Sequence, residues 1–171
     1  MTDDRSAGNN KARDALANLM THSTGSPDTP GEGELMTGLP FSQKIGMRLH
    51  MADNGIAILS IDYDDKLIGD PQSGVMHGGV VTALLDTACG AAVMCAPDKL
   101  LSTATLDLRI DYMRPASPGT RVYASAECYR MTRSIGFARA VAYHDDPDDP
   151  IASAAGSFML ERPKQKEQQG G

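Results

Sequence analysis

An apolar run between positions 80 and 96 constrains the fold of this chain more than any other feature. Thirteen of its seventeen residues are apolar, and its alanines and leucines favour a helix over a strand. The apolar residues surround the helix axis, so we expect a long helix that is buried on most sides. Asp86 lies in the middle of this run, and burying an unpaired carboxylate is costly. The residue therefore needs partners or a chemical task.

Two strand-like segments precede this helix. IGMRLHM and GIAILSIDY are separated by Asp53-Asn54-Gly55, and Asn-Gly between such segments predicts a tight β-hairpin. A short helix is expected to begin near Ser42 in LPFSQKIG. The polar stretch DDKLIGDPQSGVMHGG then predicts a loop that leads into the long helix.

Several strands are predicted after the helix. LLSTATLDLRIDYMRP alternates like a half-buried strand, with one face formed by Leu106, Leu108, Ile110 and Tyr112. Three more strand-like segments follow, separated by turn-rich stretches: RVYASAECYRM, FARAVAYH and IASAAGSFML. One helix wrapped by an antiparallel sheet gives an α+β domain, and this order of elements matches the hotdog fold.

The length of 171 residues predicts one domain, with a flexible appendage over residues 1–34, a folded domain over 35–162 and a polar tail over 163–171. The appendage contains one helical patch, KARDALANLM, and its composition leads us to expect that removing it changes little. The net charge of −6 argues against a nucleic-acid partner.

The cysteine pattern and the amino terminus favour the cytoplasm. Cys89, Cys95 and Cys128 form no C-x-x-C pair, which suggests neither a disulfide framework nor a zinc site. The first ten residues lack the apolar segment of a secretory signal, and Asp86 interrupts the one long apolar run. We therefore expect a cytoplasmic protein that has no membrane partner.

The stretch G-V-M-H77-G78-G79-V-V-T-A-L-L-D86 resembles the signature of PaaI-like hotdog acyl-CoA thioesterases. The segment from Thr105 to Ala116, which ends in Arg114-Pro115-Ala116, also resembles that family, and the resemblance covers about residues 40–160. It implies hydrolysis of an acyl-CoA thioester without a metal or cofactor. It further implies a homo-oligomer, a dimer or a tetramer made of two dimers, whose active sites lie at the dimer interface.

The residue chemistry fits thioester hydrolysis. Backbone N–H groups at a helix amino terminus can bind the developing oxyanion, and Gly78 and Gly79 allow a substrate to approach them closely. By resemblance, the Gly78 N–H polarises the carbonyl. Asp86 can serve as general base on water or as nucleophile, and both roles stay open. A structural carboxylate at a subunit contact is the alternative reading of Asp86.

Three further residues are candidates because of where they fall beside this motif. Relatives often place an Asn or Gln ahead of the His-Gly-Gly, and here Gln72 is the first candidate and Asp70 the second. A hydroxyl residue on the strand after the helix often assists the water, and Thr105 falls there. By the same resemblance, His77 chiefly shapes the loop at the substrate site.

The coenzyme carries several negative charges, so an acidic protein needs a local basic surface to bind it. Between Asp107 and Arg139 six arginines stand against three acidic residues. Arginine suits phosphate, and we expect contacts from Arg114 and from the turn Arg133-Ser134.

Two other functions remain open from the sequence. An acyl-thioester hydratase or dehydratase on the same fold would use His77 with Asp86. A non-catalytic acyl-CoA-binding module would bind the same ligand without turnover.

Overall fold

The computed structural model describes residues 34–35, 38–97 and 102–161. The predicted appendage of residues 1–34 and the tail of 163–171 lie almost wholly outside these ranges. Within them, no helix is long and apolar enough to cross a membrane.

The elements follow the predicted order. The first described elements are β1 (Glu34–Leu35), α2 (Pro40–Lys44), β2 (Met47–Asp53) and β3 (Ile56–Ile61). The 3₁₀ turn η1 (Asp65–Leu67) and the long helix α3 (Gly78–Met94) follow. After it come β4 (Ser102–Tyr112), β5 (Val122–Met131), β6 (Ile135–Tyr143) and β7 (Ala152–Glu161). The described strands form one antiparallel sheet in the order β1-β2-β3-β5-β6-β7-β4. The predicted α+β hotdog architecture is therefore confirmed.

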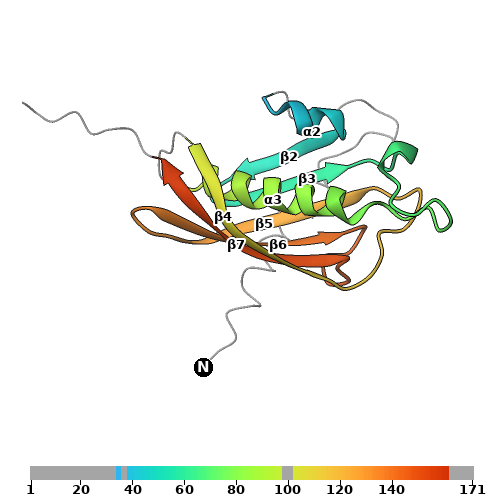
Figure 1. The fold of residues 1–171 in the computed structure, drawn as a ribbon. Coiled ribbons are helices and arrows are strands. Elements are labelled where there is room, and N and C mark those ends of the chain that lie inside the picture. Colours follow the sequence, from blue (N-terminus) through green and yellow to red (C-terminus); the bar gives the residue numbers. More distant parts are fainter. Residues whose placement is uncertain (1–33, 36–37, 98–101, 162–171) are drawn as a thin grey trace, which may run out of the picture.

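The sheet curves around α3, which lies across one face of it (Figure 1). The sheet face beneath the helix is rich in alanine, including Ala124, Ala126, Ala138 and Ala140. Because these side chains are small, the helix can approach the sheet closely and its leucines can fill the space between the layers. Residues of α3 and of this face share one core.

The β2–β3 hairpin confirms the prediction from Asn-Gly. Asn54 and Gly55 have φ angles of 48° and 80°. Two successive positive φ values define the tight turn whose twist matches a hairpin, and Asn and Gly tolerate them best. Met47 and Ile61 pair at the far end of this hairpin.

The alternation predicted for β4 is wrong at one residue. The pairing of β4 with β7 shifts between Thr105 and Asp107, so Leu106 is an extra residue at a β-bulge. Leu106 is 52% exposed, whereas Leu108 and Ile110 pack against the core. The bulge changes the phase of the strand, and Thr105 consequently reaches α3 as Leu108 and Ile110 do.

Candidate active site

The start of α3 is organised by His77. This residue is the N-cap, and its Nδ1 accepts a hydrogen bond of 2.9 Å from the Gly79 N–H. A β-carbon on residue 79 would lie 2.9 Å from that nitrogen, so the imidazole can occupy this position only beside glycine. Gly69 is needed for a similar reason, because a β-carbon there would lie 2.8 Å from the Cα of His77. The motif thus builds a compact helix start.

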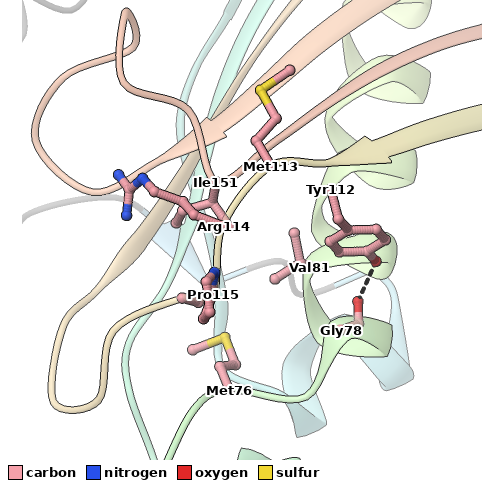
Figure 2. A pocket seen from close by; sticks show the side chains of 9 residues that line it. Met76, Gly78, Val81, Tyr112, Met113, Arg114, Pro115 and Ile151 are labelled. Atoms are coloured by element: carbon pink, nitrogen blue, oxygen red, sulfur yellow. Dashed lines mark hydrogen bonds between the residues drawn. The ribbon is translucent and has the colours of Figure 1, made fainter.

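Gly78 is the first residue of α3, and its N–H has no hydrogen-bond partner among the described residues. Its carbonyl oxygen accepts a hydrogen bond from the Tyr112 hydroxyl, at 2.7 Å (Figure 2). The Thr82 hydroxyl lies 3.1 Å from the same oxygen and 2.7 Å from the Tyr112 hydroxyl. The carbonyl side of Gly78 is therefore held by side chains, while the N–H at the positive end of the helix can receive an anion.

Beside Gly78 lies an open cavity of about 320 Å³. Met76, Val81 and Ile151 supply apolar walls, and Tyr112 stands over the start of the helix (Figure 2). The remaining lining includes Arg114 from the turn after β4. A mainly apolar cavity next to a free backbone N–H can hold a hydrophobic chain that carries a carbonyl group.

Asp86 lies near the middle of α3 and is half-buried. Its Oδ1 accepts a hydrogen bond of 2.9 Å from the hydroxyl of Thr105 on β4. The helix face that carries Asp86 thus looks toward β4, the strand at the end of the sheet, and not into the apolar core. Its partial exposure reduces the desolvation cost that full burial of a carboxylate would carry.

Asp86 and Gly78 cannot act on one carbonyl within a single chain. Eight residues of α-helix separate them, which corresponds to ~12 Å along the axis. A reacting carbon must lie about 3 Å from both the oxyanion donor and the attacking group.

Gln72 lies in an exposed turn that is organised by Asp70. The Asp70 carboxylate accepts hydrogen bonds from the Gln72 N–H and from the backbone and side chain of Ser73. These hydrogen bonds, above all the one from the Ser73 hydroxyl, lower the pKa of Asp70. Neither Gln72 nor Asp70 lines the cavity beside Gly78.

The candidate phosphate contacts lie at opposite ends of α3. Arg114 lines the cavity at the helix start, but its Nη2 is engaged by the carboxylate of Asp149 at 3.1 Å. Arg133 and Ser134 form the turn after β5, where the Ser134 carbonyl accepts a hydrogen bond from the Leu160 N–H. This turn lies toward the carboxyl end of α3, because a β-carbon on Gly136, just beyond the turn, would lie 2.9 Å from the Val93 side chain.

Most of the six arginines between Asp107 and Arg139 form ion pairs within the fold. With partners among the described residues, four of the six arginines form ion pairs: Arg109 with Asp111, Arg114 with Asp149, Arg121 with Asp62, and Arg139 with Glu127.

Tyr112 and Thr82 are site residues that sequence reasoning missed. Tyr112 was expected only to share a strand face with Leu108 and Ile110, and it lies 52% exposed beside Gly78. The only available signal was its position two residues before Arg114 in the segment from Thr105 to Ala116. Nothing in the sequence indicates that Thr82 meets a residue thirty positions away.

Three comparisons place this chain among known proteins. A model of the thioesterase superfamily matches residues 73–151. The medium/long-chain acyl-CoA thioesterase YigI of Escherichia coli is 28% identical over 135 residues, which cover 71% of this chain and 86% of the relative. A solved structure from Pseudomonas aeruginosa is 45% identical with a TM-score of 0.66, and the match covers 73% of this chain and 93% of that one.

A second solved structure, the phenylacetic acid degradation protein PaaI of Thermus thermophilus, is 25% identical with a TM-score of 0.62. That match covers 71% of this chain and 98% of the PaaI chain. The chain therefore belongs to the PaaI-like hotdog thioesterases of the thioesterase superfamily.

Proposed function

We propose that this protein is an acyl-CoA thioesterase, which hydrolyses the bond between an acyl group and coenzyme A. The observation that carries the proposal is the half-buried Asp86, which accepts a hydrogen bond from Thr105 of β4. Asp86 lies on α3, whose first N–H has no partner among the described residues and can bind an oxyanion. The thioesterase family and the name of the relative YigI support the same activity.

The reaction needs an activated oxygen and a stabilised oxyanion. As general base, Asp86 takes a proton from water while the water oxygen bonds to the acyl carbon. As nucleophile, its carboxylate bonds to that carbon first, and water then releases the acid. In either case the Gly78 N–H stabilises the oxyanion, the carbon–sulfur bond breaks, and coenzyme A leaves as the thiol.

We propose that each active site is built from two subunits. Within one chain Gly78 and Asp86 are ~12 Å apart, whereas β4, the last strand of the described sheet, offers an edge to a second copy. Exposed apolar side chains on and just after this strand, such as Leu106 and Met113, support such a contact. Pairing of two β4 strands gives a dimer, and two dimers give a tetramer.

The remaining residues receive supporting roles in this proposal. Thr105 orients Asp86, Gln72 contacts the thioester or the attacking water, and His77 and Gly79 shape the oxyanion site. Arg114 of one subunit and Arg133-Ser134 of the other bind coenzyme A phosphates, which would bring the two ends of the helix into one site. The apolar cavity beside Gly78 accepts the acyl chain.

We place this enzyme in the cytoplasm. Its three cysteines are free thiols, which agrees with a reducing compartment. The relative YigI is named for medium and long acyl chains, and the apolar cavity walls suggest the same class here.

Thiol release from a panel ranging from acetyl-CoA to palmitoyl-CoA tests the activity. We expect coenzyme A release that is fastest with medium or long acyl groups. Binding without release would indicate an acyl-CoA-binding module, and modification of the acyl group without thiol release would indicate a hydratase. Light scattering should give a dimer or tetramer, and a fully active monomer would refute the two-subunit site.

A further inference from the structure

The turn that follows β4 forms one wall of the cavity beside Gly78. β4 ends at Tyr112 and β5 begins at Val122, and we call residues 113–120 the wall turn. The first four residues of this turn all line the cavity. Figure 2 shows Pro115 beside the cavity on the side opposite Tyr112. The path of the wall turn therefore sets the width of the cavity.

The start of the wall turn is anchored to the loop between β6 and β7. The backbone N–H groups of Met113 and Arg114 donate to the Ile151 carbonyl oxygen, at 2.9 and 3.2 Å. The Arg114 guanidinium pairs with the Asp149 carboxylate at 3.1 Å and donates to the Asp149 carbonyl oxygen at 2.7 Å. Residues 113 and 114 thus have several hydrogen-bond partners in one loop.

The rest of the wall turn has few backbone hydrogen bonds because of its sequence. Pro115 and Pro118 have no N–H group to donate. Within the described part of the chain, residues 115–120 take part in no backbone–backbone hydrogen bond. The Ser117 N–H instead donates to Nε2 of His144, at 2.9 Å. His144 directly follows the last residue of β6, so this hydrogen bond connects the wall turn to the sheet.

The imidazole of His144 is held in one orientation by a second hydrogen bond. Its Nδ1 lies 2.7 Å from the carbonyl oxygen of Arg121. A carbonyl oxygen can only accept and a backbone N–H can only donate, so Nδ1 carries the proton and Nε2 keeps its lone pair. The neutral ring thus bridges Ser117 and Arg121, and only this tautomer satisfies both.

The far end of the wall turn lies close to the segment that leads into α3. In that segment the Gly74 carbonyl oxygen accepts a hydrogen bond of 2.8 Å from the Tyr63 hydroxyl. A β-carbon on Gly74 would lie 3.4 Å from the ring of Pro118, which is van der Waals contact. The wall turn therefore runs between His144 on one side and the approach to α3 on the other. A shift of the turn changes the distance between the cavity wall and the helix.

We propose that His144 is a positioning residue for the cavity that receives the acyl chain. By accepting the Ser117 N–H, it holds the wall at Pro115 and Ala116 at the distance from α3 that a long acyl chain fits. The inference rests on the proposed function, which assigns this cavity to the acyl chain. His144 is not among the residues that line the cavity, so it acts through the wall turn and not on the thioester.

His144→Gln and His144→Asn form a matched pair that tests this role. The Gln side-chain oxygen reaches the position of Nε2 and can accept the Ser117 N–H. The shorter Asn reaches only the position of Nδ1, where its amide can donate to the Arg121 carbonyl but leaves Ser117 without an acceptor. Each variant keeps one of the two hydrogen bonds, so a merely structural role predicts similar kinetics. His50→Asn is the control, because His50 is hydrogen-bonded to Ser60 at 2.8 Å and does not line the cavity.

Thiol release by the full-length variants is measured with lauroyl-CoA and with acetyl-CoA. His144→Asn should raise the KM for lauroyl-CoA about fivefold, the effect of one lost hydrogen bond. Its kcat should stay near normal, because the wall binds the acyl tail equally in the ground and transition states. His144→Gln and His50→Asn should keep the wild-type KM. The acetyl group is too short to reach the wall, so the KM for acetyl-CoA should be the same in all variants.

Amide hydrogen exchange, followed by NMR, reports on the wall turn without any catalysis. The Ser117 N–H should exchange slowly in the wild-type protein and in His144→Gln, and faster in His144→Asn. If His144→Asn does not fold, His144→Met fills a similar space without a strong acceptor and replaces it in every measurement. A Ser117 N–H that exchanges equally fast in the wild-type protein and in the variant without the acceptor would overturn the inference.

The kinetic outcomes separate this inference from the proposed function. Equal KM values for lauroyl-CoA in His144→Gln and His144→Asn would overturn the positioning role, as would an equal rise of KM for both acyl-CoAs. If the wild-type protein releases no thiol from either substrate, the proposed function fails. The same variants are then compared by calorimetry for binding of the thioether dodecyl-CoA, and equal affinities of the Gln and Asn variants would overturn the inference.

Discussion

Replacing Asp86 by Asn tests the centre of the catalytic proposal, because the substitution removes the charge and keeps the shape. Asn retains an Oδ1 that can accept the 2.9 Å hydrogen bond from Thr105. Only the charge assistance of that bond is lost, which costs less than about 1 kcal/mol at a half-buried position. Folding and oligomerisation should therefore survive.

The effect on turnover should be much larger. A general base typically contributes ~10²–10⁴ in rate, so kcat should fall by that factor, equivalent to ~2.7–5.5 kcal/mol in the barrier. KM should change little if the substrate is held by the cavity and the Gly78 N–H. The measurement is thiol release under saturating acyl-CoA, paired with the melting temperature and light scattering of the same sample.

Asp107→Asn is the matched control for this experiment. It makes the same chemical change on the neighbouring strand β4, at an exposed residue with no assigned role. We expect near-normal kcat and stability from it. A folded Asp86→Asn oligomer with wild-type kcat on the best substrate would refute the catalytic role. A variant that loses oligomer or stability while its folded fraction keeps full turnover would identify Asp86 as a structural anchor.

Three other predictions concern residues around the site and in the core. Thr105→Val should lower kcat about fivefold, the value of one lost hydrogen bond of about 1 kcal/mol, and Thr105→Ser should restore it in the same thiol-release assay. Gly79→Ala should displace His77 from its cap and lower the free energy of unfolding by about 1 kcal/mol in a urea titration. If the stability losses of Gly79→Ala and His77→Ala add fully in the double variant, the two residues do not share a cap. Burial raises the pKa of Cys89 from 9.0 to about 12, so this thiol should resist iodoacetamide at pH 8 in the native protein and react after unfolding, as mass spectrometry would detect. Because the raised pKa belongs to the folded state, the stability linked to Cys89 should be complete below pH 9 and decline up to about pH 12, and Cys89→Ala should remove that decline.

Much of the fold was predictable because its elements carry local periodic signals. The apolar run specified a long helix, and the structure begins it at Gly78, two residues before the run, because His77 caps it. Asn54-Gly55 specified the hairpin through the positive φ values that only such residues adopt easily. The motif from His77 to Asp86 also indicated which helix to propose as the carrier of the chemistry, since its spacing is a property of contiguous residues.

Tertiary structure decided what depends on residues far apart in the chain. The pairing of β4 with β7 creates the bulge at Leu106, and this bulge is what turns Thr105 toward Asp86. The approach of Tyr112 to Gly78 likewise follows from strand packing. Periodicity reports only which side of its own element a residue faces. Which distant residue it meets is settled by sheet register and curvature, because these minimise the free energy of the whole domain and not of any one segment.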